Sequence, residues 1–563
     1  MSRYFFQLDP LDAVRLLFWG AIISCSALCA TDPSLRSIIR RRWKVVLCAL
    51  ILTLLWRIPP GGHFYHGLEY EDSYVYTVAA RQVLEHTPGN EAPFGFPYSI
   101  STCEAGNLHD CSDWQTFPEH LIGAAYVICA YSRIMGYSPD AGGSVALCAA
   151  CISCCLIVLI VGIVSEDSVA ATSAALIFAI TPIFAVQGLE SSAEPVSNAA
   201  ISVVVFWLVY LLRYFSRLRP CRAILALLAL ALSIAFAMTV KRENAFLLIA
   251  VPLLLVTIGL RGMSTIPRRK MYVVGVFSVA VICGLFAWHL NIAHTGDGEL
   301  SLLTQFRPTL DAVFRIVWAF LRSLVDPSWY LGGFVFVVWG MIAWRHQKLS
   351  LAVTAVFLGY LAVYALHIRG YYELRSGNSD PRAALRFEMS LMSLWSVLGG
   401  LGVAAALRRV RFTRVSRQTW TVAAGCAVLG LCALSYAITR SLRIDGVQDE
   451  ANIRVAPALK AVQLISGPDE KANYVITFEP LVVQMYADPG TNVLDIDMIS
   501  RDECHRLGLL AGTSQAILVD EDIHHSAADA DRYSEQLSFL ANFKRTPVYM
   551  GAGFTIQRIS FAP

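Results

Sequence analysis

The stretch that decides the fold covers residues 143–164 and reads GSVALCAACISCCLIVLIVGIV. It contains no charged side chain, and as an α-helix it is about 33 Å long, enough to cross the hydrocarbon core of a bilayer. The whole chain shares this bias: 56% of its 563 residues are hydrophobic and 15% are charged, whereas a soluble domain carries about 25% charged residues. The mean hydropathy is +0.54, and the net charge of +3 is too small to indicate a nucleic acid partner. The composition therefore predicts an integral membrane protein.

Further apolar stretches of similar length predict a polytopic α-helical membrane protein with about 11 to 12 transmembrane helices. The predicted spans cover residues 11–30, 43–58, 143–164, 169–188, 195–214, 223–240, 244–260, 271–290, 330–345, 350–368, 385–406 and 419–438. The first of them is either a true span or a segment on the membrane surface. Most of the cysteines lie inside spans, where we interpret them as small apolar residues.

Clusters of basic residues orient the predicted spans. They are Arg36, Arg40, Arg41, Arg42 and Lys44; Arg213, Arg217, Arg219 and Arg222; Arg261, Arg268, Arg269 and Lys270; Arg345 and Lys348; and Arg408, Arg409, Arg411, Arg414 and Arg417. Cytoplasmic loops are enriched in Lys and Arg, so we assign every cluster to the cytoplasmic side. Even numbers of spans separate consecutive clusters, as a consistent topology requires. This topology makes residues 59–142 one large outer loop, with residues 119–136 along the membrane surface, and it places the chain after residue 438 outside.

The C-terminal region alternates β-branched runs with helix-like segments, which indicates a small α/β domain. The predicted strands are residues 474–478, 493–496, 516–519, 547–550 and 554–559. We therefore divide the chain into three parts. Residues 1–42 form an N-terminal extra helix and a cytoplasmic basic loop. Residues 43–440 form the transmembrane core with the outer loop 59–142, and residues 441–563 form a soluble extracytoplasmic α/β domain.

The outer loop holds the first candidates for chemistry. Glu71 and Asp72 follow the span that ends near residue 58, and the helical spacing after Asp72 predicts a surface helix over about residues 71–86. A structural explanation is also available, because Asp72 could cap that helix. Cys103 and Cys111 lie in the polar part of the same loop, where oxidation is permitted, and we predict a disulfide between them.

The sequence EDSYVYTVAAR at residues 71–81 resembles the GT-C superfamily of integral membrane glycosyltransferases, in particular the protein O-mannosyltransferases and the lipid A aminoarabinose transferases. These have an acidic residue in the first outer loop, in a pattern similar to Asp-Glu-x-x-Tyr with an Arg five residues after the Tyr. The pattern aligns without gaps with Asp72, Ser73, Tyr76 and Arg81. Ser73 stands where the family usually has Glu, so both Glu71 and Asp72 are candidates for the catalytic acid. We place that acid at Asp72.

Weaker matches follow in the family's order. The sequence FPEHL at residues 117–121 is similar to the family's second surface helix, and it contains His120. Glu194, which precedes Pro195, resembles the second acidic position, which serves an acceptor or a metal, with Glu190 as the alternative. The candidate partners of the donor phosphate are the basic residues Lys241, Arg242, Arg382 and Arg386. Tyr76, Arg81 and His120 are supporting candidates. The structural alternatives are a solvated turn at Lys241 and Arg242, a helix start at Glu194, and a snorkelling side chain at Arg386.

The resemblance implies a GT-C-like fold and the transfer of a sugar from a polyprenyl-phosphate-linked donor to a protein, lipid or glycan acceptor on the extracytoplasmic face of a plasma or inner membrane. Such transfer needs a carboxylate to take the acceptor's proton and cations to bind the departing phosphate. We assign no cofactor, and a divalent metal stays open because some relatives use one and others do not. The alternative function is a multi-span transporter of a small or lipid-linked solute. Carriers are built from structural repeats, which this sequence does not show.

Overall fold

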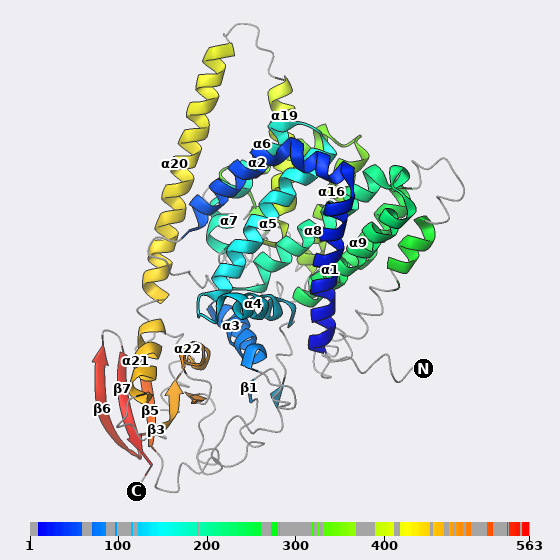
Figure 1. Cartoon of the computed structure of the whole chain (residues 1–563). Coiled ribbons are helices and arrows are strands. Elements are labelled where there is room, and N and C mark those ends of the chain that lie inside the picture. Colours follow the sequence, from blue (N-terminus) through cyan, green and yellow to red (C-terminus); the bar gives the residue numbers. More distant parts are fainter. Residues whose placement is uncertain are drawn as a thin grey trace, which may run out of the picture. The chain divides into compact units, whose positions relative to one another are not determined.

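The computed structural model describes residues 10–58, 70–85, 96–97, 114–115, 122–188, 191–259, 272–279, 281, 318, 321–322, 324–326, 330–366, 389–409, 417–450, 454–466, 472–477, 479–487, 491–496, 515–521, 538, 540–551 and 554–561. The chain forms two compact units (Figure 1). The first unit consists of Met1–Leu68, His120–Val127 and Gly143–Arg443. The second consists of Glu69–Glu119, Ile128–Gly142 and Ile444–Pro563.

The first unit is built from helices. They are α1 (Pro10–Thr31), α2 (Pro33–Arg57), α5 (Ala141–Val164), α6 (Ser168–Ile180), α7 (Pro182–Gln187), α8 (Ala193–Tyr214), α9 (Pro220–Val240), α10 (Phe246–Leu254), α15 (Phe334–Ala343), α16 (Lys348–Leu366), α19 (Met392–Arg409) and α20 (Arg417–Glu450). Within the described residues, 6 helices are long and apolar enough to cross a membrane. They are Asp12–Thr31, Ala141–Val164, Ala193–Arg217, Pro220–Val240, Met389–Arg409 and Gly425–Arg443. Each of them coincides with a predicted span, so the prediction of a polytopic helical membrane protein is confirmed.

The first basic cluster lies on a helix, whereas we predicted a loop. Helix α2 begins at Pro33 and includes the residues from Arg36 to Lys44. Asp32 caps this helix by accepting a hydrogen bond of 2.9 Å from the Ser34 N–H. No Gly or Pro follows inside α2, so nothing interrupts the helix between the cluster and the apolar run.

The predicted span 169–188 is interrupted at Pro182, which separates α6 from α7. Proline has no N–H, so the Phe178 carbonyl, four residues earlier, loses its helical donor. The completely buried Arg57 supplies it: its Nη2 donates to Phe178 O at 3.1 Å and to Phe184 O at 3.0 Å. Arg443 of α20 donates to the neighbouring Ala185 carbonyl at 2.6 Å. Two arginines therefore satisfy the main chain at this break.

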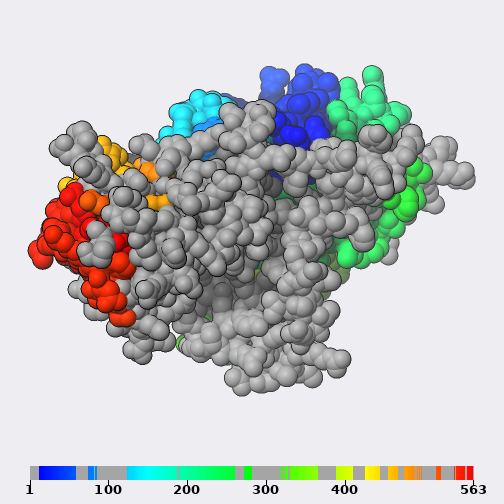
Figure 2. Space-filling model, turned by 90° about the horizontal axis from the view of Figure 1, so that it is seen from below, coloured from blue at the N-terminus to red at the C-terminus, as the bar shows by residue number. Residues whose placement is uncertain are grey.

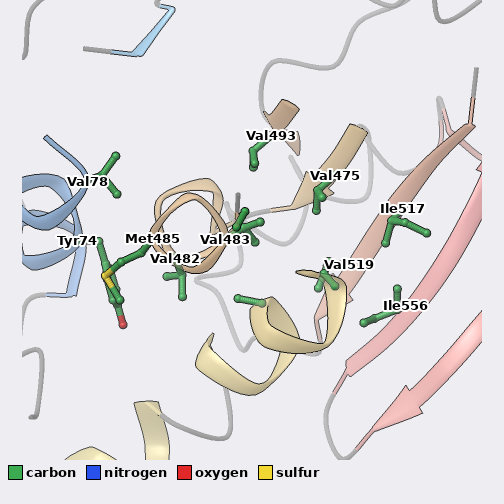
Figure 3. Close-up of a cluster of buried hydrophobic side chains, with 13 residues drawn as sticks. Tyr74, Val78, Val475, Val482, Val483, Met485, Val493, Ile517, Val519 and Ile556 are labelled. Carbon is green, nitrogen blue, oxygen red and sulfur yellow. The ribbon is translucent and has the colours of Figure 1, made fainter. Parts of the chain in front are cut away.

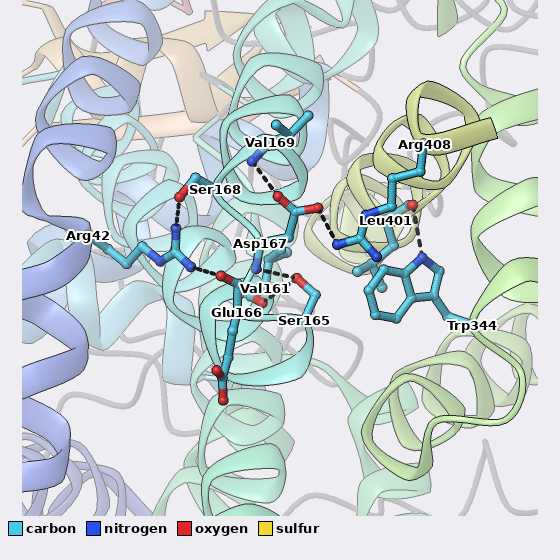
Figure 4. A network of polar contacts seen from close by, with 10 residues as sticks. All are labelled: Arg42, Val161, Ser165, Glu166, Asp167, Ser168, Val169, Trp344, Leu401 and Arg408. Carbon is cyan, nitrogen blue, oxygen red and sulfur yellow. Dashed lines mark hydrogen bonds and ion pairs between the residues drawn. The ribbon is translucent and has the colours of Figure 1, made fainter. Parts of the chain in front are cut away.

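Basic residues from different predicted clusters meet at the turn between α5 and α6. Arg42, Arg213 and Arg408 all bind residues 166–168, Arg42 through hydrogen bonds and the other two through ion pairs. Figure 4 shows Arg42 and Arg408 at this turn. The ion pairs join Arg213 to Glu166 and Arg408 to Asp167, with 2.8 Å between Arg408 Nη2 and Asp167 Oδ2. Three clusters that we assigned to one side of the membrane therefore lie at one end of the helix bundle.

The second unit contains the predicted α/β domain. Its strands are β3 (Ala472–Thr477), β4 (Asn492–Asp495), β5 (Gln515–Glu521), β6 (Lys544–Gly551) and β7 (Phe554–Ser560), and its helices include α21 (Ala456–Ile465) and α22 (Pro480–Tyr486). The order in the sheet is β4-β3-β5-β7-β6. Strand β3 pairs in parallel with β4 and β5, while β7 pairs antiparallel with β5 and β6. All the predicted strands are confirmed, and Figure 2 shows the atoms of β6 and β7, in red, at the surface.

Two helices from the predicted outer loop are also described. Helix α3 covers Tyr70–Glu85, close to the predicted 71–86, and α4 covers Ile122–Met135. With 14 residues, α4 is about 21 Å long, shorter than the hydrocarbon core of about 30 Å. Its length fits the predicted surface segment. A short antiparallel pair, β1 (Phe96–Pro97) with β2 (Trp114–Gln115), completes the described part of this loop.

Candidate active site

Helix α3, which carries the candidate acids in its first turn, is part of the core of the second unit. Tyr74 and Val78 are buried in one apolar cluster with side chains of α21, α22 and the sheet. Figure 3 shows Tyr74 beside Met485 of α22. The next turn of the same face carries Arg81, whose guanidinium donates to main-chain carbonyls at the end of α22. One face of α3, at positions 74, 78 and 81, is therefore fixed to the C-terminal domain.

This packing separates the two candidate acids. On an ideal helix, position 72 lies about 160° around the axis from position 74, and position 71 about 60°. Asp72 thus shares the opposite face of α3 with Tyr76, which is 5% exposed, while Glu71 lies beside the face that packs on the C-terminal domain. The side chains of Glu71 and Asp72 lie outside the described part of the structure. Position 72 is therefore on the face of α3 opposite to Tyr74, and position 71 is beside the Tyr74 face.

The first unit contains an ion pair between two predicted site residues. Lys241 Nζ lies 2.9 Å from Glu194 Oε1, and the side chains are 10% and 1% exposed. Glu194 is in the first turn of α8 and Lys241 ends α9. The Lys241 ammonium also lies 5.6 Å from the centre of the Tyr364 ring of α16. The interpretation of Lys241 as part of a solvated turn is wrong, because the side chain is buried and paired.

A hydrogen-bond network adjoins this ion pair. Asn244 Nδ2 donates to Ser197 Oγ at 3.0 Å and to Ala237 O at 2.7 Å, and its Oδ1 accepts from the Tyr360 hydroxyl at 2.8 Å. The network ties the beginning of α8 to the end of α9 and to α16. Buried polar groups with satisfied partners define one arrangement of the helices that carry them. The ion pair therefore sits in a fixed polar centre at one end of the bundle.

Solved structures that match almost the whole chain identify the fold. The chain is similar to ArnT from Cupriavidus metallidurans bound to undecaprenyl phosphate, with a TM-score of 0.58, 11% identity, and coverage of 93% of this chain and 99% of that chain. The apo state of the same protein gives a TM-score of 0.55, 11% identity, and coverage of 92% and 97%. ArnT is a GT-C glycosyltransferase. This chain has the GT-C fold.

The resemblance drawn from the residues is thereby confirmed at the level of the fold. No protein-family model matches the chain, and no curated protein matches it. At 11% identity the likeness concerns the architecture, and the roles of residues need evidence from the site itself.

Several predicted site residues fall outside the described residues. They are Glu190, Arg382, Arg386, His120, Cys103 and Cys111. Arg242 begins the short 3₁₀ helix Arg242–Ala245 directly after Lys241, and its side chain is outside the described part as well. The structure thus brings Glu194 and Lys241 together in one unit, and it places Asp72, Tyr76 and Arg81 on α3 in the other.

The sequence did not decide whether the protein binds a divalent metal. Among the side chains that the structure describes, no group of three His, Cys, Asp or Glu residues is placed to hold a metal ion.

The sequence analysis missed several polar residues that the GT-C fold buries. Asn244 was not singled out, and neither were Tyr360 and Tyr364 in the predicted span 350–368. Their spacing of four residues in an otherwise apolar span was an available signal, because it places two hydroxyls on one helix face. Arg57 was also missed, although a charged residue at the end of an apolar run indicates a specific partner.

Proposed function

We propose that this protein is a membrane glycosyltransferase that transfers a sugar from a polyprenyl-phosphate-linked donor to an acceptor on the extracytoplasmic face. The observation that carries the proposal is the GT-C fold over 93% of the chain, shared with an ArnT structure that binds undecaprenyl phosphate. Two features of the chain's own residues support it: the acids at the start of α3 and the buried charges at one end of the helix bundle.

The distribution of basic residues supports the extracytoplasmic side of the membrane. Helix α8 carries Glu194 in its first turn and Arg213 in its last turn, about 28 Å apart. Arg213 reaches the turn where other basic clusters converge, and such clusters favour the cytoplasmic side. Glu194 and Lys241 then belong to the outer end, where a nucleotide sugar of the cytoplasm has no access. A sugar donor attached to a lipid carrier can reach the outer end.

The proposed chemistry is one displacement at the anomeric carbon of the donor. The acceptor oxygen or nitrogen forms a bond to this carbon while the bond from the carbon to the phosphate oxygen breaks, and the electron pair leaves with the phosphate. Asp72 takes the acceptor's proton as general base. Lys241, Arg242, Arg382 and Arg386 are the candidates that stabilise the phosphate as its charge grows. Glu194 fixes the position of Lys241 through their ion pair.

The test uses the purified protein with a panel of polyprenyl-phosphate sugars, each labelled in the sugar. We expect one donor to lose its label with release of polyprenyl phosphate when membrane extract supplies acceptors. Asp72→Asn should lose most of this turnover. Adding a chelator to the same assay tests the open question of a divalent metal.

Two results would contradict the proposal. If no donor in the panel were consumed while labelled solute or lipid crossed reconstituted vesicles, the chain would be a transporter. If transfer persisted at the wild-type rate in both Asp72→Asn and Glu71→Gln, the first turn of α3 would have no part in the chemistry.

A further inference from the structure

Arg81 binds the carboxyl end of a helix in the C-terminal domain. Its Nη1 donates to Gln484 O at 2.9 Å and to Ala487 O at 2.6 Å, with Met485 O at 3.5 Å. These carbonyls lie at the end of α22, Pro480–Tyr486, where the last turn of a helix has no internal donors. A cation at this end is also favoured by the helix dipole. Arg81 therefore caps α22 from a position 403 residues earlier in the chain.

Tyr137 holds the same guanidinium from another segment. Its ring centre lies 5.0 Å from the Arg81 Cζ, and its hydroxyl donates to Met485 O at 3.1 Å. A guanidinium over an aromatic ring gains further attraction. The outer-loop segment after α4 and the helix α3 thus converge on one helix end in the C-terminal domain.

The contact is too far from the candidate acid to take part in chemistry. Arg81 and Asp72 are nine positions apart on α3, or about 13.5 Å along the axis. Tyr74 and Val78 occupy the intervening turns of the Arg81 face and are buried against the domain core. Any influence of Arg81 on Asp72 must therefore pass through the position of the helix.

We infer that Arg81 is a positioning residue: by capping α22, it fixes the rotation and height of α3 on the C-terminal domain, and with them the place of the catalytic acid. The inference rests on the proposed function and deepens it, because it gives the C-terminal domain a part in catalysis as the support of α3. If only the apolar side chains of Tyr74 and Val78 held α3, the helix could shift or rotate slightly against the C-terminal domain. The directional hydrogen bonds of Arg81 select one register.

The test compares Arg81→Gln with Arg81→Lys and Tyr137→Phe in the full-length protein. Gln removes the charge, and Lys keeps it on a compact ammonium that lacks the planar fork of the guanidinium. Tyr137→Phe keeps the ring and loses one hydrogen bond. Arg545→Gln is the matched control, since Arg545 also donates to a main-chain carbonyl of the same domain, Leu540 O at 3.1 Å.

Two quantities are measured: kcat and KM for the labelled donor, and hydrogen exchange of the amides in α3 and α22. We expect Arg81→Gln to lower kcat by about 10- to 100-fold, as a displaced catalytic group does, with KM for the donor changed by less than about twofold. Exchange in α3 and α22 should rise in the same variant. Arg81→Lys should recover part of kcat, Tyr137→Phe should lose less than Arg81→Gln, and Arg545→Gln should match the wild type.

Other outcomes overturn the inference. A rise in KM at unchanged kcat would make Arg81 a substrate ligand, and lower kcat with unchanged exchange in α3 would make it a direct participant. Unchanged kcat and exchange would leave it without a positioning role. Should Arg81→Gln fail to fold, Arg81→Lys and Tyr137→Phe carry the same comparison. Hydrogen exchange needs no turnover, so a wild-type protein that transfers no sugar would refute the proposed function while the exchange data still decide the contact.

Discussion

Lys241 Nζ and Glu194 Oε1 lie 2.9 Å apart in an environment where neither side chain is more than 10% exposed. Two opposite charges removed from water attract each other strongly, but each has lost its hydration. The pair is therefore stable only as a pair. Loss of one partner leaves an uncompensated buried charge, whereas loss of both leaves none.

The ion pair predicts a specific pattern of stability and activity. Glu194→Gln and Lys241→Met should each destabilise the protein by about 3 to 5 kcal/mol, because one charge stays behind. The double variant should regain most of the thermal stability, since both charges leave together. Under the proposed function the pair belongs to the site, so the double variant should be stable and inactive. Thermal unfolding in detergent and donor turnover are the two measurements.

A structural role alone would give another result for the same three variants. The double variant would then regain turnover along with its melting temperature, and Glu194 and Lys241 would have to be removed from the proposed site.

The register of α3 predicts which acid is catalytic. Asp72→Asn should lower kcat by about 10²- to 10⁴-fold, the usual contribution of a general base, and leave donor binding nearly unchanged. Glu71→Gln should keep most of the activity, because position 71 lies beside the face that packs on the C-terminal domain. Single-turnover assays with labelled donor measure both. A dead Glu71→Gln with an active Asp72→Asn would move the catalytic role by one residue.

The break at Pro182 predicts coupling between two distant residues. Arg57→Met should lower stability by about 1 to 3 kcal/mol, because the buried Phe178 carbonyl loses its donor at 3.1 Å. Pro182→Ala restores an N–H four residues after Phe178 and should offset part of that loss in the double variant. Melting temperatures of the wild type, both single variants and the double variant test this. Strictly additive effects would show that Arg57 does not replace the missing helical donor.

The contact between α15 and α19 predicts intolerance of a single methyl group. A Cβ at Gly402 would overlap the Phe336 carbonyl oxygen, and a Cβ at Gly340 would overlap the Leu398 carbonyl oxygen. Gly402→Ala should therefore destabilise the protein by about 1 to 3 kcal/mol through forced separation of the helices. Gly425→Ala on α20 is the control, because a Cβ there meets nothing within 4 Å. The melting temperature of Gly402→Ala should fall, and that of Gly425→Ala should stay or rise slightly. Equal melting temperatures would mean that the two helices can separate without cost.

Local patterns predicted the elements well, and they could not predict how the elements pair. The β-branched runs located every described strand of the C-terminal sheet, because such residues favour pleated, half-buried surfaces. The apolar runs located the spans because a helix that crosses the hydrocarbon core needs about 20 consecutive apolar residues. The break between α6 and α7 was missed, although Pro182 was visible, because the donor that makes it tolerable, Arg57, lies 121 positions from Phe178.

The site shows the same limit. The sequence placed Glu194 and Lys241 at turns on one side of the membrane, yet their pairing depends on α8 and α9 lying together. It also indicated a surface helix over about residues 71–86 from the spacing that follows Asp72, but it did not identify the apolar face with Tyr74 and Val78. Nothing in that face specifies its partner. We assigned the loop to the transmembrane core, and the structure groups α3 with the C-terminal domain instead.

The pairing of α3 with α22 has a consequence for biosynthesis. The 403 positions between Arg81 and Gln484 take roughly 20 to 80 s to translate at ordinary rates. During that interval α22 has not been synthesised, so the apolar face of α3 is unpacked. An unpacked apolar face is exposed to chaperones and proteases. A chain that ends before Ile444 never acquires the partner. On the proposed role of Arg81, only a polypeptide that extends through α22 holds α3 in its place on this domain.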